Sequence, residues 1–281
     1  MKNLKIVLAK NAGACYGVQR ALDMTYKAFD AYGSVQTLGP LIHNPGVVRN
    51  LENLGIGVAQ SPDQATSKAI IIRSHGVVPQ VIRNLEKKGL TVVDATCPHV
   101  MRAQKAAARL AKDGYHVLVV GEAGHPEVEG ISAHALEESG KCTIVGCPED
   151  IPELFEEKIG IVVQTTQSRE KLEQIVEALQ NRGINPVVKD TICSATTQRQ
   201  EAASTLAHDA DVMIVLGGRN SSNTTRLFEL CSKQCQRVFH IETVDEIDAS
   251  WFEEEEVVGI SAGASTPEDQ IKSVISYLES L

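Results

Sequence analysis

The chain has 281 residues, of which 43% are hydrophobic and 22% are charged, and its formal net charge is −9. This composition is typical of a globular protein and excludes a disordered one. Only 4% of the residues are aromatic, and no block of lysine and arginine offsets the acidic charge, so we expect no nucleic-acid partner.

Apolar, strand-like runs alternate with amphipathic stretches along the whole chain. The expected strands cover residues 4–9, 69–74, 91–96, 116–121, 159–165, 185–190, 211–218, 237–241 and 257–261. The expected helices cover residues 17–31, 100–113, 169–181, 196–208, 223–235 and 268–278. This alternation predicts an α/β protein with mostly parallel sheets. The first apolar run is too short for a signal peptide or a membrane span, so we expect a cytoplasmic protein with no membrane partner.

Three of the seven cysteines share one local pattern, in which a strand and a turn lead to the cysteine and a helix follows. They are Cys15, Cys97 and Cys193, and the residues 28 positions further on are His43, His125 and Ser221. Each of these residues lies in a loop after a strand, and a second loop follows later in each segment. The pattern predicts three α/β units, at residues 15–96, 97–192 and 193–281. The alternative is that the regular alternation of any α/β protein gives equal spacings by chance.

The third unit ends without the closing strand that the first two possess. The N-terminal segment, residues 1–14, contains a strand that leads to Cys15 and can complete the third unit. The repeat is then circular, and we expect its three units to be related by a pseudo-threefold axis that the three cysteines face.

Cysteines that precede helices are suited to metal binding, because the helix N-terminus favours the thiolate form. Three thiolates can hold a zinc ion with an open fourth position, or an iron–sulfur cluster with one iron not bound by protein. The alternative is that each cysteine is a small buried hydrophobic residue. We interpret the remaining four as packing or surface thiols: Cys142, Cys147, Cys231 and Cys235.

The loops carry hydrogen-bond donors that suit an anionic, phosphorylated ligand. They are His43, His75, His125, Thr165, Thr196, Ser221, Ser222, Asn223 and Ser265. The run SSNTT opens an expected helix, whose N-terminus can bind an anion, although each Ser or Asn can also be an ordinary helix cap. No phosphate-binding lysine loop and no GxGxxG motif occurs, which argues against nucleotide binding.

The stretch GHPEVEG, residues 124–130, directly follows an apolar run that reads as a buried strand. We interpret it as a glycine-flanked turn that places His125 and Glu127 at the carboxyl end of that strand, where open α/β sheets bind ligands. The alternative is a surface turn with two exposed acids.

Motifs along the whole chain resemble those of the 4-hydroxy-3-methylbut-2-enyl diphosphate reductase family. They are CYGVQRA, LIHNPGVV, SHGV, DATCP, GHPEVEG, QTT, ICSATTQRQ, NSSNT and AGAS, in this order. The resemblance implies three α/β units around a central iron–sulfur cluster. One difference is Ala14, where the family usually has Phe before the first cysteine.

The resemblance also implies roles for the candidate residues. Cys15, Cys97 and Cys193 would each ligate one iron of a 4Fe-4S cluster, and the fourth iron would be left for substrate. The residues implied to bind the substrate are His43, His75, His125, Thr165, Ser221, Ser222, Asn223 and Ser265. Thr165 and Glu127 would lie near the substrate hydroxyl, with Glu127 as the catalytic proton donor, and Thr196 would help to fix this network.

The implied reaction is a two-electron reductive dehydroxylation that converts an allylic diphosphate to isopentenyl and dimethylallyl diphosphate. A small carrier of the ferredoxin or flavodoxin type would supply the electrons. Two alternatives remain open from the residues themselves. One is a zinc hydrolase with three thiolate ligands and Glu127 as base, and the other is a non-catalytic phospholigand-binding protein.

Overall fold

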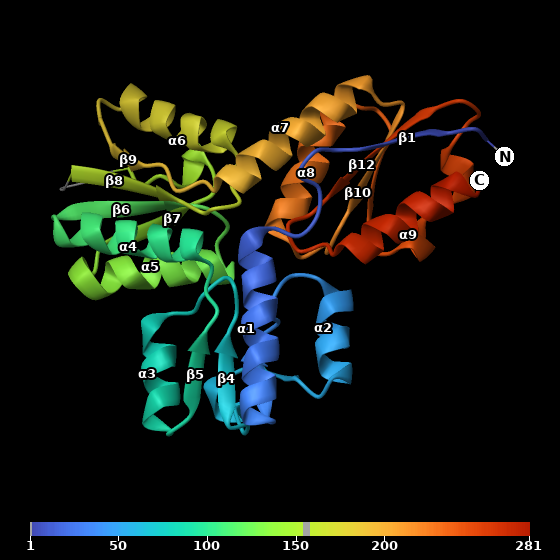
Figure 1. Cartoon of the computed structure of the whole chain (residues 1–281). Helices are drawn as coiled ribbons and strands as arrows, with labels where there is room; N and C mark the ends of the chain where they lie inside the picture. The colour runs from blue at the N-terminus through green and yellow to red at the C-terminus, as the bar shows by residue number, and fades with distance from the viewer. Residues whose placement is uncertain (1, 154–157) are drawn as a thin grey trace. The chain divides into compact units, whose positions relative to one another are not determined.

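The computed structural model describes residues 2–153 and 158–281. This part of the chain forms three sheets of four parallel strands each, with helices between successive strands (Figure 1). The predicted α/β class with parallel sheets is therefore confirmed.

The three sheets share one strand order, in which the first strand of each set lies between the second and the third. The first sheet has the order β3-β2-β4-β5, from β2 (Val35–Leu38), β3 (Gly57–Ala59), β4 (Ala69–Ile72) and β5 (Thr91–Asp94). The second has the order β7-β6-β8-β9, from β6 (Tyr115–Val120), β7 (Cys142–Val145), β8 (Lys158–Val163) and β9 (Val187–Lys189). The third has the order β11-β10-β12-β1, from β10 (Val212–Leu216), β11 (Val238–Ile241), β12 (Val257–Ala262) and β1 (Lys5–Leu8).

The N-terminal strand occupies the edge position of the third sheet. Lys5 of β1 pairs with Val257 of β12, and Leu8 pairs with Ile260, in parallel register. The corresponding edge positions of the other two sheets are held by β5 and β9, which are the last strands of their own sets. The N-terminal strand thus lies at the edge of the third sheet, and that it completes a third sequence unit stays a prediction.

The chain divides into two compact units. One comprises Met1–Val18, His43–Arg49 and Ser194–Leu281 and contains the third sheet; we call it unit 1. The other comprises Gln19–Ile42 and Asn50–Cys193 and contains the first and second sheets; we call it unit 2. The boundaries of the three sequence repeats and their threefold relation stay predictions.

Nine helices are described, and they begin and end within a few residues of the predicted positions where a prediction exists. They are α1 (Tyr16–Tyr32), α2 (Pro45–Asn53), α3 (Pro79–Lys87), α4 (Pro98–Lys112), α5 (Pro126–Ser139), α6 (Arg169–Asn181), α7 (Ser194–Asp209), α8 (Ser222–Ser232) and α9 (Glu268–Glu279) in residues 2–153 and 158–281. Among these residues, no helix combines the length and the apolar character needed to cross a membrane.

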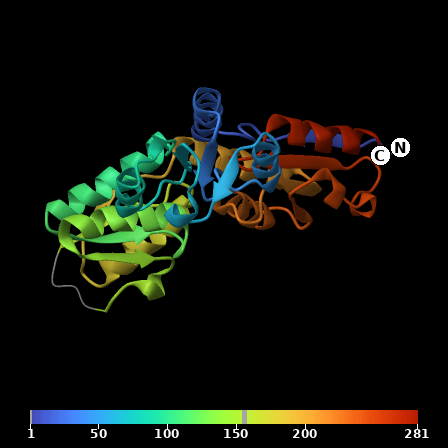
Figure 2. The ribbon, with the colours of Figure 1, turned by 90° about the horizontal axis from the view of Figure 1, so that it is seen from below.

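The central strand of the second sheet is buried on both faces. Val117 and Val119 of β6 pack in one cluster with α4 and α5, whereas Leu118 and Val120 pack in another with α6. Helices α4 and α5 lie side by side on one face of this sheet (Figures 1 and 2). Burial on both faces explains why the strand reads as a continuous apolar run.

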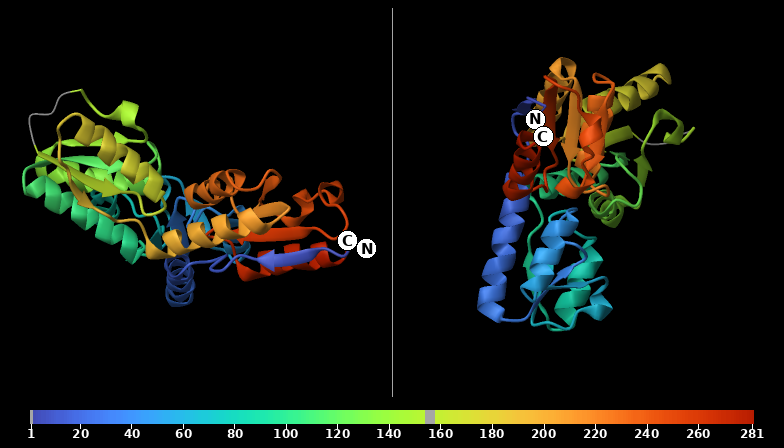
Figure 3. Two further views of the ribbon diagram at one scale, coloured as in Figure 1. Left: turned by 90° about the horizontal axis from the view of Figure 1, so that it is seen from above. Right: turned by 90° about the vertical axis from the view of Figure 1, so that its right-hand side faces the viewer.

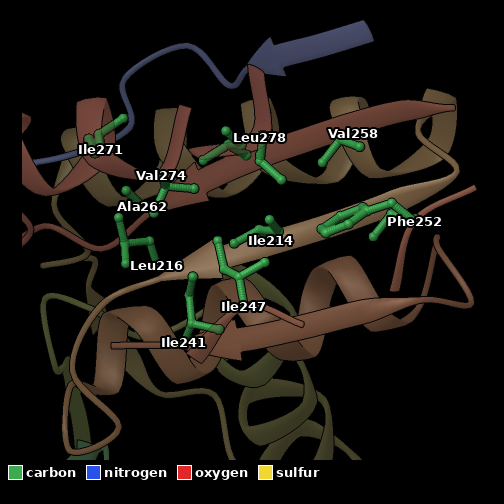
Figure 4. Close-up of a cluster of buried hydrophobic side chains, with 12 residues drawn as sticks. Ile214, Leu216, Ile241, Ile247, Phe252, Val258, Ala262, Ile271, Val274 and Leu278 are labelled. Atoms are coloured by element: carbon green, nitrogen blue, oxygen red, sulfur yellow. The ribbon is translucent and has the colours of Figure 1, made fainter. Parts of the chain in front are cut away.

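The third sheet is covered in the same way. Ile214 and Leu216 of β10 share a buried cluster with Val274 of α9 (Figure 4), whereas Met213 and Val215 share one with α7 and α8. Figure 3 shows α9 on one face of this sheet and α7 on the other. Because helices cover both faces, the loops at the carboxyl ends of the strands are where polar residues can face a ligand.

Candidate functional site

Each of the three candidate cysteines lies between an edge strand and a helix. Cys15 directly precedes α1, Cys97 is the N-cap of α4, and Cys193 directly precedes α7, as the sequence predicts. In each case the edge strand leads to the cysteine, so all three occupy the carboxyl ends of their sheets.

A repeated backbone hydrogen bond fixes each cysteine against the loop that follows the neighbouring strand. The N–H of Cys97 donates to the carbonyl oxygen of Ser74 at 2.9 Å, and the N–H of Cys193 donates to that of Thr165 at 3.0 Å. The N–H of Cys15 donates to the carbonyl oxygen of Ala264, also at 3.0 Å. Cys97 is therefore held next to the loop of His75, Cys193 next to Thr165, and Cys15 next to the loop of Ser265.

Glu127 is buried, with a relative exposure of only 2%, on the first turn of α5. Its Oε1 accepts the backbone N–H of Thr165 at 2.6 Å, and its Oε2 accepts the Thr165 hydroxyl at 3.0 Å. Burial raises the pKa of Glu127 to about 7, although both Thr165 hydrogen bonds favour the carboxylate and lower it. A carboxyl group with a pKa near neutrality is suited to deliver a proton.

His125 is the N-cap of α5, and its Nδ1 accepts the backbone N–H of Glu127 at 3.2 Å. Burial, and secondly the positive charge of Arg73, lower the pKa of His125 to about 4, so the ring is neutral at pH 7. Because Nδ1 is an acceptor in a neutral ring, the proton resides on Nε2. The ring of His75 lies edge-on to that of His125, with centroids 5.6 Å apart.

The structure corrects the interpretation of residues 124–130 as a turn. Only the first residues form one, and α5 begins at Pro126. Proline suits the first helical position because its missing N–H has no partner there in any case, and the His125 ring caps the next free N–H. Glu127 is therefore held by a helix, and the alternative of a surface acid is wrong for this residue because it is buried.

Unit 2 thus brings together Cys97, Cys193, His75, His125, Glu127 and Thr165 at the carboxyl ends of its two sheets. Unit 1 contains the remaining candidates, namely Cys15, His43, Thr196, Ser221, Ser222, Asn223 and Ser265. Thr196 is buried in the first turn of α7.

The start of α8 forms the candidate anion site of unit 1. Ser221 is the N-cap, and its hydroxyl oxygen accepts the backbone N–H of Thr224. Asn223 has a relative exposure of 3%, and neither its amide nitrogen nor its amide oxygen has a hydrogen-bond partner among the described residues. A buried amide without a partner is costly, so this arrangement is expected where a ligand supplies the missing bonds.

The loop of His43 lies against the same region of unit 1. The Ser265 hydroxyl donates to the His43 carbonyl oxygen at 3.0 Å. A Cβ atom on Gly218, in the loop after β10, would lie only 2.5 Å from that carbonyl oxygen. Glycine at position 218 therefore permits the close approach of the His43 loop to the loop that carries Ser221.

We expect Asn223→Ala to weaken the binding of an allylic diphosphate by about 1–3 kcal/mol, the scale of a hydrogen bond to a charged group. Ser232→Ala at the exposed end of the same helix is the matched control. Calorimetry under argon measures both variants. Equal affinity of the Asn223 variant and the control would contradict a diphosphate site at the start of α8.

Two arginines near the candidate residues were not predicted as site residues: Arg73 is half-buried and Arg199 is buried. Arg73 directly precedes the Ser74–His75 pair, and its charge acts on His125. Arg199 in α7 is buried, and its Nη2 donates to the carbonyl oxygen of Gly13 at 2.8 Å, which anchors the loop before Cys15. The sequence could have indicated both arginines, because Arg73 lies in RSHG and Arg199 lies in TTQRQ, next to candidate site residues.

All seven cysteines are free thiols. Cys231 and Cys235 are buried in the core cluster under α7 and α8, and burial raises the pKa of Cys231 to about 12. Over residues 2–153 and 158–281, no three or more His, Cys, Asp or Glu side chains form a group that could hold a metal ion.

A model of the LytB protein family matches residues 6–279 of the chain. The chain is 47% identical, over 98% of its length and 97% of the relative's, to 4-hydroxy-3-methylbut-2-enyl diphosphate reductase of Geobacter sulfurreducens. It is 46% identical to the enzyme of the same name from Pelobacter propionicus, over 98% of each chain.

Two solved structures resemble the chain over nearly its whole length. One is (E)-4-hydroxy-3-methyl-but-2-enyl diphosphate reductase, the terminal enzyme of the non-mevalonate pathway, with a TM-score of 0.73, 42% identity and 99% of each chain covered. The other is E-1-hydroxy-2-methyl-but-2-enyl-4-diphosphate reductase from Plasmodium falciparum, with a TM-score of 0.91, 27% identity, and 98% of this chain and 88% of that chain covered.

Proposed function

The chain belongs to the LytB family, and from this premise we propose that it reduces 4-hydroxy-3-methylbut-2-enyl diphosphate. It is an oxidoreductase that acts in the non-mevalonate isoprenoid pathway. The products are isopentenyl and dimethylallyl diphosphate, formed when two electrons and two protons are taken up and the allylic hydroxyl leaves as water. The match of the family over residues 6–279 carries this conclusion.

We further propose that Cys15, Cys97 and Cys193 hold a 4Fe-4S cluster. The donor set fits such a cluster, because all three are free thiols that directly precede helices and are tied by the same backbone hydrogen bond. When bound, the cluster would supply electrons and an iron open to the substrate. The electron donor is a small ferredoxin- or flavodoxin-type protein, and the enzyme works in the cytoplasm.

The substrate's diphosphate is assigned to neutral donors. Asn223, with Ser221 and Ser222, offers hydrogen bonds and the N-terminus of α8 to the anion. His43 and Ser265, which are joined by a hydrogen bond in unit 1, are assigned to the same anion. His75 and His125 are assigned to the phosphate oxygens too, and His125 as a neutral ring with its proton on Nε2 is a donor.

Glu127 is assigned to deliver a proton to the departing hydroxyl, so that it leaves as water. Its position is fixed by Thr165, which binds both carboxyl oxygens. A neutral, protonated Glu127 can donate, and its pKa of about 7 leaves a large protonated fraction at neutral pH. Thr165 therefore holds the proton donor and is assigned to the same end of the substrate.

The test is purification without oxygen, followed by iron and sulfide analysis, a visible spectrum and turnover with a chemical reductant. We expect a brown protein that consumes the allylic diphosphate under reduced methyl viologen. A colourless, zinc-containing protein that hydrolyses phosphate esters would instead support a zinc hydrolase. A colourless protein that binds the diphosphate without converting it would support a non-catalytic binding protein.

A further inference from the structure

Helix α4 differs in charge from the other α-helices within residues 2–153 and 158–281. It carries two arginines and two lysines and no acidic residue, whereas each of the others contains at least one Asp or Glu. The whole chain has a net charge of −9, so this helix is a local exception. A basic surface on an acidic protein marks a place where an acidic partner is attracted rather than repelled.

The four basic side chains lie on one exposed face of α4. Arg102, Lys105, Arg109 and Lys112 follow one another at intervals of three or four residues, and all four are exposed. We call these four residues the α4 basic stripe; ten residues of helix give it a length of about 15 Å. The opposite face of α4, which includes Ala103, Ala107 and Leu110, is buried in the core of unit 2.

Little of the stripe's charge is neutralised. Nε of Arg109 forms an ion pair with Oδ2 of Asp113 at 3.0 Å, but the Arg109 side chain is still 76% exposed. Arg102, Lys105 and Lys112 form no ion pair with any residue that the structure describes. Exposed ion pairs are weak and easily exchanged, so Arg109 is also open to a partner.

The stripe begins beside a proposed iron ligand. Cys97 is the N-cap of α4, and Arg102 lies five residues further along the helix. At the same end, Nη1 of Arg20 donates to the carbonyl oxygen of Thr96 at 3.1 Å and adds another positive charge. Arg20, Thr96 and helix α4 all belong to unit 2. Only the Arg102 end of the stripe lies near Cys97, because Lys112 is about 22 Å further along the helix.

The reaction needs two electrons that the chain itself does not supply. We take these electrons from the small ferredoxin- or flavodoxin-type carrier proposed above. We propose that the α4 basic stripe is the docking surface for an acidic one-electron carrier. This proposal rests on the function proposed above, because it requires the cluster.

The electron balance sets the number of carrier molecules that must dock on the stripe in each turnover. Each carrier is oxidised by one electron, so two dockings accompany each turnover. The substrate's C–O bond breaks, the hydroxyl leaves as water with one proton, and a second proton is added to the allyl carbon chain. Electron-transfer complexes are small, short-lived and steered by charge, which suits a single helix face.

The experiment compares two reductants on the cluster-loaded enzyme. The triple variant Arg102→Glu, Lys105→Glu and Lys112→Glu is assayed with reduced methyl viologen and with a reduced, acidic plant-type ferredoxin as probe. With ferredoxin we expect kcat/KM to fall by about tenfold or more, the lower end of the range for electrostatic steering. With methyl viologen we expect unchanged turnover. The wild type should also lose rate with ferredoxin as salt rises, and the variant should not.

The matched control reverses three exposed lysines elsewhere in unit 2, Lys27→Glu, Lys87→Glu and Lys189→Glu, so that both variants change the net charge equally. An equal loss with ferredoxin in the control and the triple variant would overturn the proposal, because net charge alone would then act. Unchanged ferredoxin kinetics in the triple variant would overturn it as well. If the triple variant loses its cluster, single Ala variants at the same positions answer the question. Absence of turnover with both reductants in the wild type, with no iron, would instead refute the proposed function.

Discussion

Serine in place of Cys15, Cys97 or Cys193 is expected to remove most of the iron and nearly all of the reductase activity. Each of these thiols directly precedes a helix and is tied through its backbone N–H to a loop that carries a candidate substrate residue. Serine is close in size, so the backbone hydrogen bond and the fold should persist while the ligand is lost. Iron and sulfide analysis, the visible spectrum and turnover with reduced methyl viologen measure the effect.

The remaining cysteines provide matched controls. Cys231→Ala and Cys235→Ala change buried thiols of the core in unit 1, and Cys142→Ser changes a half-buried thiol that accepts a hydrogen bond from Ser132. Alanine is used at the two buried positions because a hydroxyl there would need a partner. All three controls should keep iron and activity. Equal iron in the six variants would reject the proposed ligands.

The arrangement of strands was predictable because every strand that builds it leaves a strong local signal. Buried parallel strands such as β10, with Ile214 and Leu216, read as continuous apolar runs, and the equal spacing after the cysteines indicated a repeat. The edge position of β1 followed from counting strands in each repeat. In the structure, β1 pairs in parallel with β12 at the edge of the third sheet.

The details of the site were less predictable because they depend on side-chain contacts between segments distant in sequence. Nothing in GHPEVEG shows that Pro126 starts a long helix or that Thr165, 38 residues later, binds both oxygens of Glu127. The effect of Arg73 on His125 likewise joins two loops. Sequence patterns identify such residues as candidates, but burial and partners decide their protonation.

Glu127→Gln is expected to slow turnover by about 10²–10⁴-fold while the cluster still assembles, the range typical for loss of a general acid. Glutamine keeps the size of the side chain and can accept the Thr165 N–H, so substrate binding should change little. The control is Glu129→Gln, an exposed carboxylate on the same turn of α5 that accepts the Gly124 N–H. Anaerobic turnover and the visible spectrum with substrate measure both variants. Loss of the cluster in the Glu127 variant would make this residue structural, and wild-type turnover would remove it from the mechanism.

The pH dependence separates a proton donor from a buried structural acid. The pKa of Glu127 is raised from 4.5 to about 7, so the protonated form needed for donation is lost as pH rises through 7. The wild-type rate should fall above this pH, and the Gln variant should lack that fall.

The pH dependence of the free energy of unfolding reports the titration of Glu127 independently of catalysis. Between pH 4.5 and 7 the unfolded chain has released this proton while the folded chain keeps it, so the free energy of unfolding declines across that window. The Gln variant should escape this decline, which is of the order of 3 kcal/mol for a shift of that size. Denaturant unfolding at pH 5 and pH 8 measures it. Parallel stability curves for the two proteins would show that Glu127 titrates near its ordinary pKa and is not protonated at neutral pH.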